Sequence, residues 1–369
     1  MSRPSRRALQ RLGFGALSLG VVVATFAFIL PSIADYRDVW AMVQQLSWEW
    51  IVLLLAFTLL NLATFAPPWM VALPGLSFVQ ALTVTQTSTA LSIVVPGGLV
   101  AGVAASYGML RRWGFASREV ARAVTLTSLW NQFLNLSFPV VAAFLLTSAG
   151  GDAALLGLVA FVGVAVLGVA VAALAVVLVS KRLARDVGDL AARLADWALG
   201  KVRRGPVTWG GPSFERFRQS SGDLLRRRWH ALTAASLAGS LSVFAVLVVS
   251  LRAFGVSGAE VSLVEAFAAW SFIRIIGTIP ITPGGFGIVE LGLTSALIGF
   301  GGANAAVVGA VLVYRFLTIV PTLLVGLAAA ATWRRHGRAE AGTAPELGPP
   351  GARPEGQGPI PPDHPVGTM

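Results

Sequence analysis

A glycine-rich break in an apolar stretch carries the charged residues that are best placed for chemistry. Residues 279–287 read Ile-Pro-Ile-Thr-Pro-Gly-Gly-Phe-Gly; proline removes backbone donors there, and glycine removes the side chains that stiffen a helix. Arg274 precedes the break and Glu290 follows it. Backbone groups without partners in lipid cost several kcal/mol each, so such a break must be buried in protein or line a wet cavity. The pattern predicts a binding site.

The chemistry that these residues favour is anion binding. Arg315 lies about eleven residues into the last apolar span, or ~16 Å deep at ~1.5 Å per residue, near the bilayer centre. An arginine there costs ~2.5–3.5 kcal/mol without a partner, and we expect Glu290 to be that partner. One carboxylate and two guanidiniums leave an excess positive charge, to which the break adds backbone amides at the start of a half-helix. The predicted substrate-binding residues here are Arg274, Pro283, Gly284, Gly285, Gly287, Glu290 and Arg315.

A purely structural role for the same charges is an equally weighted alternative. In it, Glu290 and Arg315 tie the broken segment to the last helix and bind nothing else. The two roles are compatible, because an ion pair that fixes the turn also shapes any cavity beside it.

An earlier stretch, residues 78–110, contains a second break of the same kind but no charge. Pro96-Gly97-Gly98 interrupts it, and Asn131, Gln132 and Asn135 lie in the following span. Asn131 and Asn135 share a helix face because they are four residues apart. We expect them to bond the Pro96-Gly97-Gly98 turn, to line the cavity or to join helices, the last being favoured. These six residues complete the predicted site.

Composition excludes most other classes of protein. The chain is 55% hydrophobic and 12% charged, with a mean hydropathy of +0.74, which is typical of a polytopic α-helical membrane protein. The net charge of +11 comes from clusters at the ends of apolar spans, so it predicts contact with anionic inner-leaflet lipid rather than nucleic acid. The chain has no cysteine, and its three histidines lie at a span edge or in the tail. We expect no metal, no cofactor and no catalytic residues.

Charge placement decides between two topologies. We expect six full spans, at about 12–34, 49–66, 120–148, 152–180, 230–254 and 304–332. If both broken segments are re-entrant hairpins, 24 of the 28 Lys and Arg face the cytoplasm, in residues 1–11, 111–122, 181–228 and 334–353. If the first segment spans instead, the arginines of 111–118 face outward and everything downstream inverts. The first arrangement is favoured, with both termini cytoplasmic and the protein in the inner (plasma) membrane.

The same arrangement exposes an internal repeat. Repeat one covers about 49–148 and repeat two about 230–332, and each has a span, a hairpin with a Pro-Gly-Gly turn, a Gly-Phe link and a long helix. The first hairpin enters from the cytoplasm and the second from outside, as in the inverted-topology repeats of secondary transporters. The fold class is thus all-α, with about six transmembrane helices plus two re-entrant helical hairpins in one domain, 1–333.

Two further segments are predicted outside this core. Residues 181–229 hold twelve Lys or Arg against five Asp or Glu and carry an apolar stripe, which favours an amphipathic helix on the inner leaflet. A soluble helix packed on the bundle is nearly as well supported. Residues 334–369 are rich in Pro and Gly, and we expect a disordered cytoplasmic tail.

The run from Thr282 to Glu290 closely resembles the signature of the flippase-like family, also called the lysylphosphatidylglycerol synthase transmembrane region. The resemblance covers roughly residues 10–333, including the Pro96-Gly97-Gly98 turn and the Arg111-Arg112-Trp113-Gly114 link. In the full-length synthases, this module is thought to move aminoacylated phospholipid that a separate cytosolic domain makes. We expect no counterpart of that domain in residues 334–369, and hence no enzymatic activity.

Two functions therefore stay open. The first is a flippase or transporter that binds the anionic headgroup of a membrane phospholipid or lipid-linked substrate at mid-membrane, between the two hairpins. The alternative is a non-transporting scaffold subunit of envelope glycolipid or polysaccharide synthesis, whose partner is another envelope-biosynthesis protein. Under the alternative, neutralising Glu290 would affect folding alone.

Overall fold

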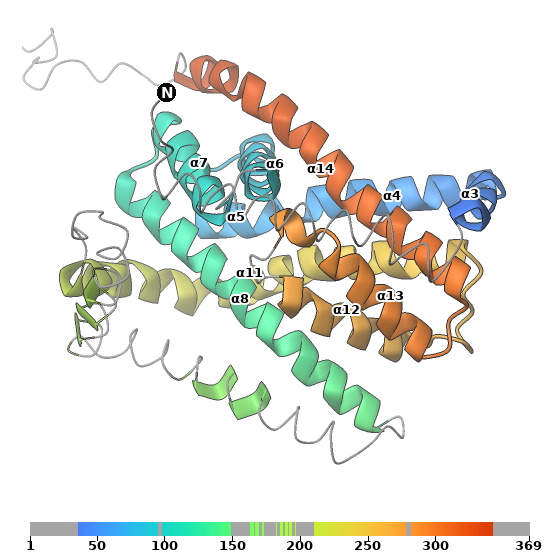
Figure 1. Ribbon diagram of the computed structural model, residues 1–369. Helices are drawn as coiled ribbons and strands as arrows, with labels where there is room; N and C mark the ends of the chain where they lie inside the picture. The colour runs from blue at the N-terminus through green and yellow to red at the C-terminus, as the bar shows by residue number, and fades with distance from the viewer. Residues whose placement is uncertain are drawn as a thin grey trace, which may run out of the picture.

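The structure, a computed structural model, describes residues 36–94, 98–148, 210–277 and 282–341, together with scattered residues between 163 and 196. Within these residues every regular element is helical (Figure 1). The elements are α3 (Tyr36–Gln44), α4 (Trp48–Thr64), α5 (Pro67–Ala72), α6 (Phe78–Val94), α7 (Gly98–Arg112), α8 (Ser117–Ser148), α11 (Gly211–Ala253), α12 (Leu263–Gly277), η2 (Pro283–Gly285), α13 (Ile288–Gly299) and α14 (Asn304–Ala341). The predicted all-α class holds for the part of the chain that is described.

Among the described residues, four segments are long and apolar enough to cross a membrane: Trp48–Ala72, Ser117–Ser148, Arg227–Ala253 and Asn304–Ala330. They match four of the six predicted spans. The predicted span at 12–34 lies outside the described residues, and so does most of the one at 152–180. Large apolar side chains on α4, among them Leu55 and Leu59, are more than half exposed, as suits a surface that faces lipid.

Helix ends differ from the predicted spans in three places. Pro67 and Pro68 begin α5 rather than ending the second span, because proline suits the first helical turn, where its missing N–H has no partner to lose. Helix α14 continues to Ala341, past the point where the tail was expected to begin, through residues such as alanine and arginine that favour helix. Helix α11 begins at Gly211, so the end of the predicted surface segment 181–229 is continuous with the following span.

Helices α6 and α7 form the first hairpin. The first arm starts with a capping box, in which the Ser77 backbone N–H donates to Gln80 Oε1 at 3.1 Å and the Gln80 N–H donates to Ser77 Oγ at 3.3 Å. The arms pack so closely that a Cβ added to Gly102 would lie 2.6 Å from the Ser88 carbonyl oxygen. Helix α6 ends at Val94 and α7 begins at Gly98, while Pro96 and Gly97 lie outside the described residues.

Helices α12 and α13 form the second hairpin, joined through η2. Its first arm starts with the same device: the Ser262 N–H donates to Glu265 Oε2 at 2.8 Å, and the Glu265 N–H donates to Ser262 Oγ at 3.3 Å. The arms again approach closely, since a Cβ on Gly292 would lie 2.7 Å from Ile273 Cδ1. The two hairpins therefore begin and pack alike.

The long helix that follows each hairpin packs on the first arm of the other one. Helix α14 lies along α6, where the Thr87 hydroxyl donates to the Gly326 carbonyl at 3.3 Å, and α8 lies along α12 (Figure 1). The hairpin tips also meet, because a Cβ on Gly284 of η2 would lie 3.1 Å from Ile93 Cγ2 near the end of α6. Because each long helix packs on the hairpin of the other repeat, the two predicted repeats form one packed unit. The re-entrant placement of the tips within a bilayer stays a prediction.

An aromatic cluster fixes the arm of the second hairpin that carries Arg274. Trp270 of α12 packs against Phe138 of α8 and Phe244 of α11, with ring centroids 5.2 Å and 5.5 Å apart. Phe267, one turn earlier, lies 5.8 Å from Trp270 by the same measure. Aromatic contacts of this kind stabilise by about 0.5–1.5 kcal/mol each beyond area burial. Since Arg274 follows Trp270 by one helical turn, the cluster sets where the guanidinium lies.

Candidate functional site

The turn of the second hairpin depends on glycine. Gly284 and Gly287 have φ of 61° and 84°, in the left-handed region that side chains disfavour. Between them the backbone turns through η2 and brings Gly287 to the start of α13. The predicted break is therefore a sharp turn, which leaves Glu290 in the first turn of the following helix.

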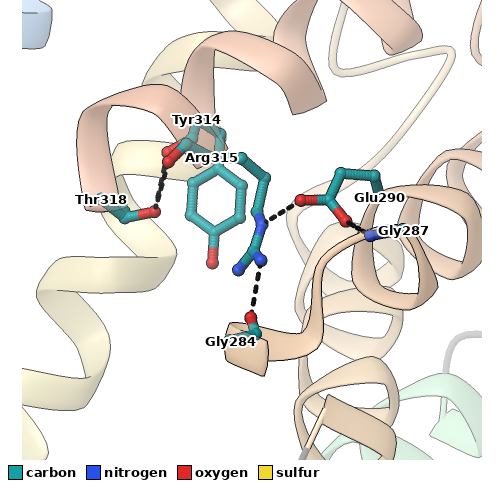
Figure 2. Close-up of polar contacts among 6 residues, drawn as sticks. All are labelled: Gly284, Gly287, Glu290, Tyr314, Arg315 and Thr318. Atoms are coloured by element: carbon teal, nitrogen blue, oxygen red, sulfur yellow. Dashed lines mark hydrogen bonds and ion pairs between the residues drawn. The ribbon is translucent and has the colours of Figure 1, made fainter. Parts of the chain in front are cut away.

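Glu290 and Arg315 form an ion pair at the base of this turn (Figure 2). Arg315 Nε donates to Glu290 Oε1 at 2.6 Å, with the carboxylate side chain 1% exposed and the guanidinium side chain 14% exposed. Arg315 Nη2 also donates to the Gly284 carbonyl at 2.9 Å, and Glu290 Oε2 accepts the Gly287 N–H at 2.6 Å. The predicted pairing is confirmed, and it ties α13, the turn and α14 together.

The backbone amides of the turn are largely engaged within it. The Gly287 N–H is held by Glu290, and the Gly285 N–H donates to the Thr282 carbonyl at 3.2 Å. The predicted use of these amides as anion donors is therefore not supported for Gly285 or Gly287. The side chain of Glu290 bends back to cap its own helix and takes one of the donors that an anion would need.

A cavity of ~340 Å³ lies between the two repeats. Every long helix contributes to its wall, as do both hairpins and η2. Its lining is mostly neutral: Asn61 of α4 and Phe65 just after it; Thr85, Gln86, Thr89 and Ile93 of α6; Asn135 of α8; Val243 of α11; Trp270, Arg274 and Gly277 of α12; Gly284 of η2; Val289 of α13; and Tyr314, Arg315, Thr318, Ile319 and Thr322 of α14. Four residues of the predicted site line this cavity: Asn135, Arg274, Gly284 and Arg315.

Arg274 is a cation of the cavity that no described carboxylate neutralises. Its Nε donates to Asn135 Oδ1 at 2.7 Å, and its guanidinium carbon lies 5.0 Å from the centroid of the Trp270 ring. Asn135 in turn donates through Nδ2 to Gln132 Oε1 at 3.2 Å. Among the described residues, no carboxylate lies within ion-pair distance of Arg274. Arg315, by contrast, faces Glu290, so the cavity carries a net positive charge at Arg274.

The other described residues predicted for the first half of the site are not found among the residues that line the cavity. Asn131 is exposed and does not line the cavity, and Gln132 reaches it only through Asn135. Gly98 begins α7, while Pro96 and Gly97 lie outside the described residues. The predicted role of this first turn stays a prediction.

Sequence reasoning left out several polar residues of the cavity wall. Asn61, Gln86, Thr318 and Thr322 line it, although none was proposed for the site. Their shared signal is an uncharged polar side chain in an apolar helix, which is also the signal of ordinary helix–helix contacts. The sequence alone does not separate the two roles.

Comparison with known proteins gives the chain a family. The family model described as the lysylphosphatidylglycerol synthase TM region matches residues 15–326. A search of curated proteins found no significant match. Because the family match covers most of the chain and four helices are able to cross a membrane, the protein is a multi-pass membrane protein of a lipid-related family. The chain belongs to the lysylphosphatidylglycerol synthase TM region family.

Proposed function

We propose that this protein moves a lipid or lipid-linked substrate across the cell membrane and holds the anionic headgroup in the cavity between its two hairpins. The observation that carries the proposal is Arg274, a cavity-lining guanidinium with no carboxylate partner among the described residues. A cation in a low-dielectric place is costly unless it is paired, so the cavity favours an anionic ligand.

The charges divide between two tasks. Arg315 is neutralised by Glu290 and holds the Gly284 carbonyl, so it fixes the turn that forms part of the cavity wall. Arg274 is oriented by Asn135 from the other repeat and stacks on Trp270, which leaves its Nη groups for a phosphate. A ligand at Arg274 would therefore lie where the two repeats meet, as substrate does in transporters built from inverted repeats.

The test is lipid transfer in liposomes that contain the purified protein. A fluorescent phosphatidylglycerol in one leaflet should equilibrate faster with wild-type protein than in empty liposomes. Arg274→Gln removes a charge-assisted hydrogen bond of about 1.5–3 kcal/mol, and the rate should fall by about 10-fold or more. Arg118→Gln removes an exposed arginine outside the cavity and should leave the rate near the wild-type value. A folded wild-type protein that transfers no lipid would favour the scaffold role.

A further inference from the structure

Three threonine hydroxyls in the cavity wall can accept hydrogen bonds, but their own protons are already donated. The Thr318 hydroxyl donates to the Tyr314 carbonyl at 2.9 Å, and the Thr322 hydroxyl donates to the Thr318 carbonyl at 3.0 Å. On the facing helix, the Thr85 hydroxyl donates to the Ala81 carbonyl at 2.8 Å. Each hydroxyl proton is thus used within its own helix, and the lone pairs are what these residues offer a ligand.

Two side-chain amides in the same wall also donate to the protein through their nitrogens and leave their oxygens as acceptors. Gln86 Nε2 donates to the Leu62 carbonyl at 3.2 Å, and Asn61 Nδ2 donates to Ser242 Oγ at 2.9 Å. The Ser242 hydroxyl itself donates to the Gly239 carbonyl, so it must accept from Asn61. No described residue donates to Gln86 Oε1 or Asn61 Oδ1. We name Asn61, Thr85, Gln86, Thr318 and Thr322 the acceptor belt.

The acceptor belt is uncharged, and the buried carboxylate of Glu290 is engaged elsewhere. Glu290 does not line the cavity, and both of its oxygens are held by Arg315 and Gly287. An ammonium group placed here would lose its hydration, gain no carboxylate and lie in the field of Arg274. A hydroxyl group, by contrast, needs only a neutral acceptor.

Resting on the proposed function, we infer that the ligand is a phosphodiester with an uncharged, hydroxylated headgroup, a polyol or a sugar. The phosphate binds Arg274, and the headgroup hydroxyls donate to the acceptor belt. Headgroups that carry an ammonium, such as ethanolamine or an aminoacyl ester, are disfavoured by the same arrangement.

Three short-chain lipids that share one phosphodiester test this assignment by direct binding to the purified full-length protein. Phosphatidylglycerol has headgroup hydroxyls, phosphatidylmethanol has none, and phosphatidylethanolamine has an ammonium. One lost hydrogen bond corresponds to about 2- to 12-fold in affinity, so phosphatidylglycerol should bind at least that much more tightly than the other two. Free glycerophosphate is tested as a fourth ligand. If it binds as tightly as phosphatidylglycerol, the assignment to a lipid is overturned.

Two sets of variants separate this inference from the proposed function. Thr318→Val and Thr322→Val keep the side-chain shape but remove the acceptor oxygen, so they should reduce the preference for phosphatidylglycerol over phosphatidylmethanol. Thr127→Val is the matched control, because its hydroxyl makes the same bond to the carbonyl four residues earlier but lies outside the cavity. Equal binding of all three lipids, with Arg274→Gln still weakening each, would overturn the headgroup assignment and leave the anion site intact. Binding of none of them, or binding that ignores Arg274→Gln, would overturn both.

Discussion

The buried ion pair between Glu290 and Arg315 allows a quantitative test of how the second hairpin is held. Glu290→Gln keeps the shape of the side chain but removes its charge, so Arg315 is left with the Gly284 carbonyl and an amide oxygen. Arg315→Gln leaves the carboxylate with only the Gly287 amide. With the two side chains 1% and 14% exposed, each change strands a charge largely out of water and should cost ~3–5 kcal/mol of unfolding free energy.

The double variant distinguishes pairing from two separate effects. Without either charge, Glu290→Gln with Arg315→Gln should cost little more than one single change, a coupling of about 3 kcal/mol. The assay is the unfolding free energy of the purified protein in mixed micelles as a denaturing detergent is titrated. The control cycle pairs Glu290→Gln with Arg252→Gln, because Arg252 donates to the Val256 and Val261 carbonyls in another loop. That cycle should be additive to within about 0.5 kcal/mol.

Additive costs for Glu290 and Arg315 would refute the reasoning, since they would mean that neither charge depends on the other. The charge exchange, Glu290→Arg with Arg315→Glu, should recover stability better than either of its single changes. Transport need not recover with it, because position 315 lines the cavity and would then present a carboxylate to the anion.

Three other expected outcomes follow from the packing and the charge pattern. A cysteine introduced at Ser117 should resist labelling by a membrane-impermeant reagent applied outside intact cells, and rapid labelling would contradict the first re-entrant hairpin. Gly326→Ala should destabilise the protein by about 1–3 kcal/mol, because its Cβ would lie 2.6 Å from Ala90 Cβ and overlap the Gln86 carbonyl; Gly108→Ala, with nothing within 4 Å, should not. A synthetic 181–199 peptide should bind anionic vesicles at low salt, and failure to do so would count against a membrane-surface segment.

The broken segments and the ion pair could be predicted because their signals are local. Prolines and glycines within apolar runs mark the turns, and the depth of Arg315 in its span demands a partner such as Glu290. The engagement of the Gly287 amide also had a local signal, since a glutamate three residues after the start of a helix is the capping-box position.

The contact between Arg274 and Asn135 could not be predicted from any local sequence pattern. The two residues are 139 apart in the sequence and belong to different repeats. They meet because the long helix of one repeat packs on the hairpin of the other, and hydrophobic periodicity does not specify that exchange. The hydrogen bonds of Asn61 and Gln86 likewise depend on tertiary packing, because each joins two different helices.

The most direct test of the anion site is an experimental structure of the protein in nanodiscs that contain phosphatidylglycerol. We expect a lipid phosphate in the cavity within hydrogen-bonding distance of the Arg274 guanidinium, and its loss in the Arg274→Gln variant. A cavity that holds an acyl chain or water beside Arg274, with phosphates confined to the membrane surface, would contradict the account.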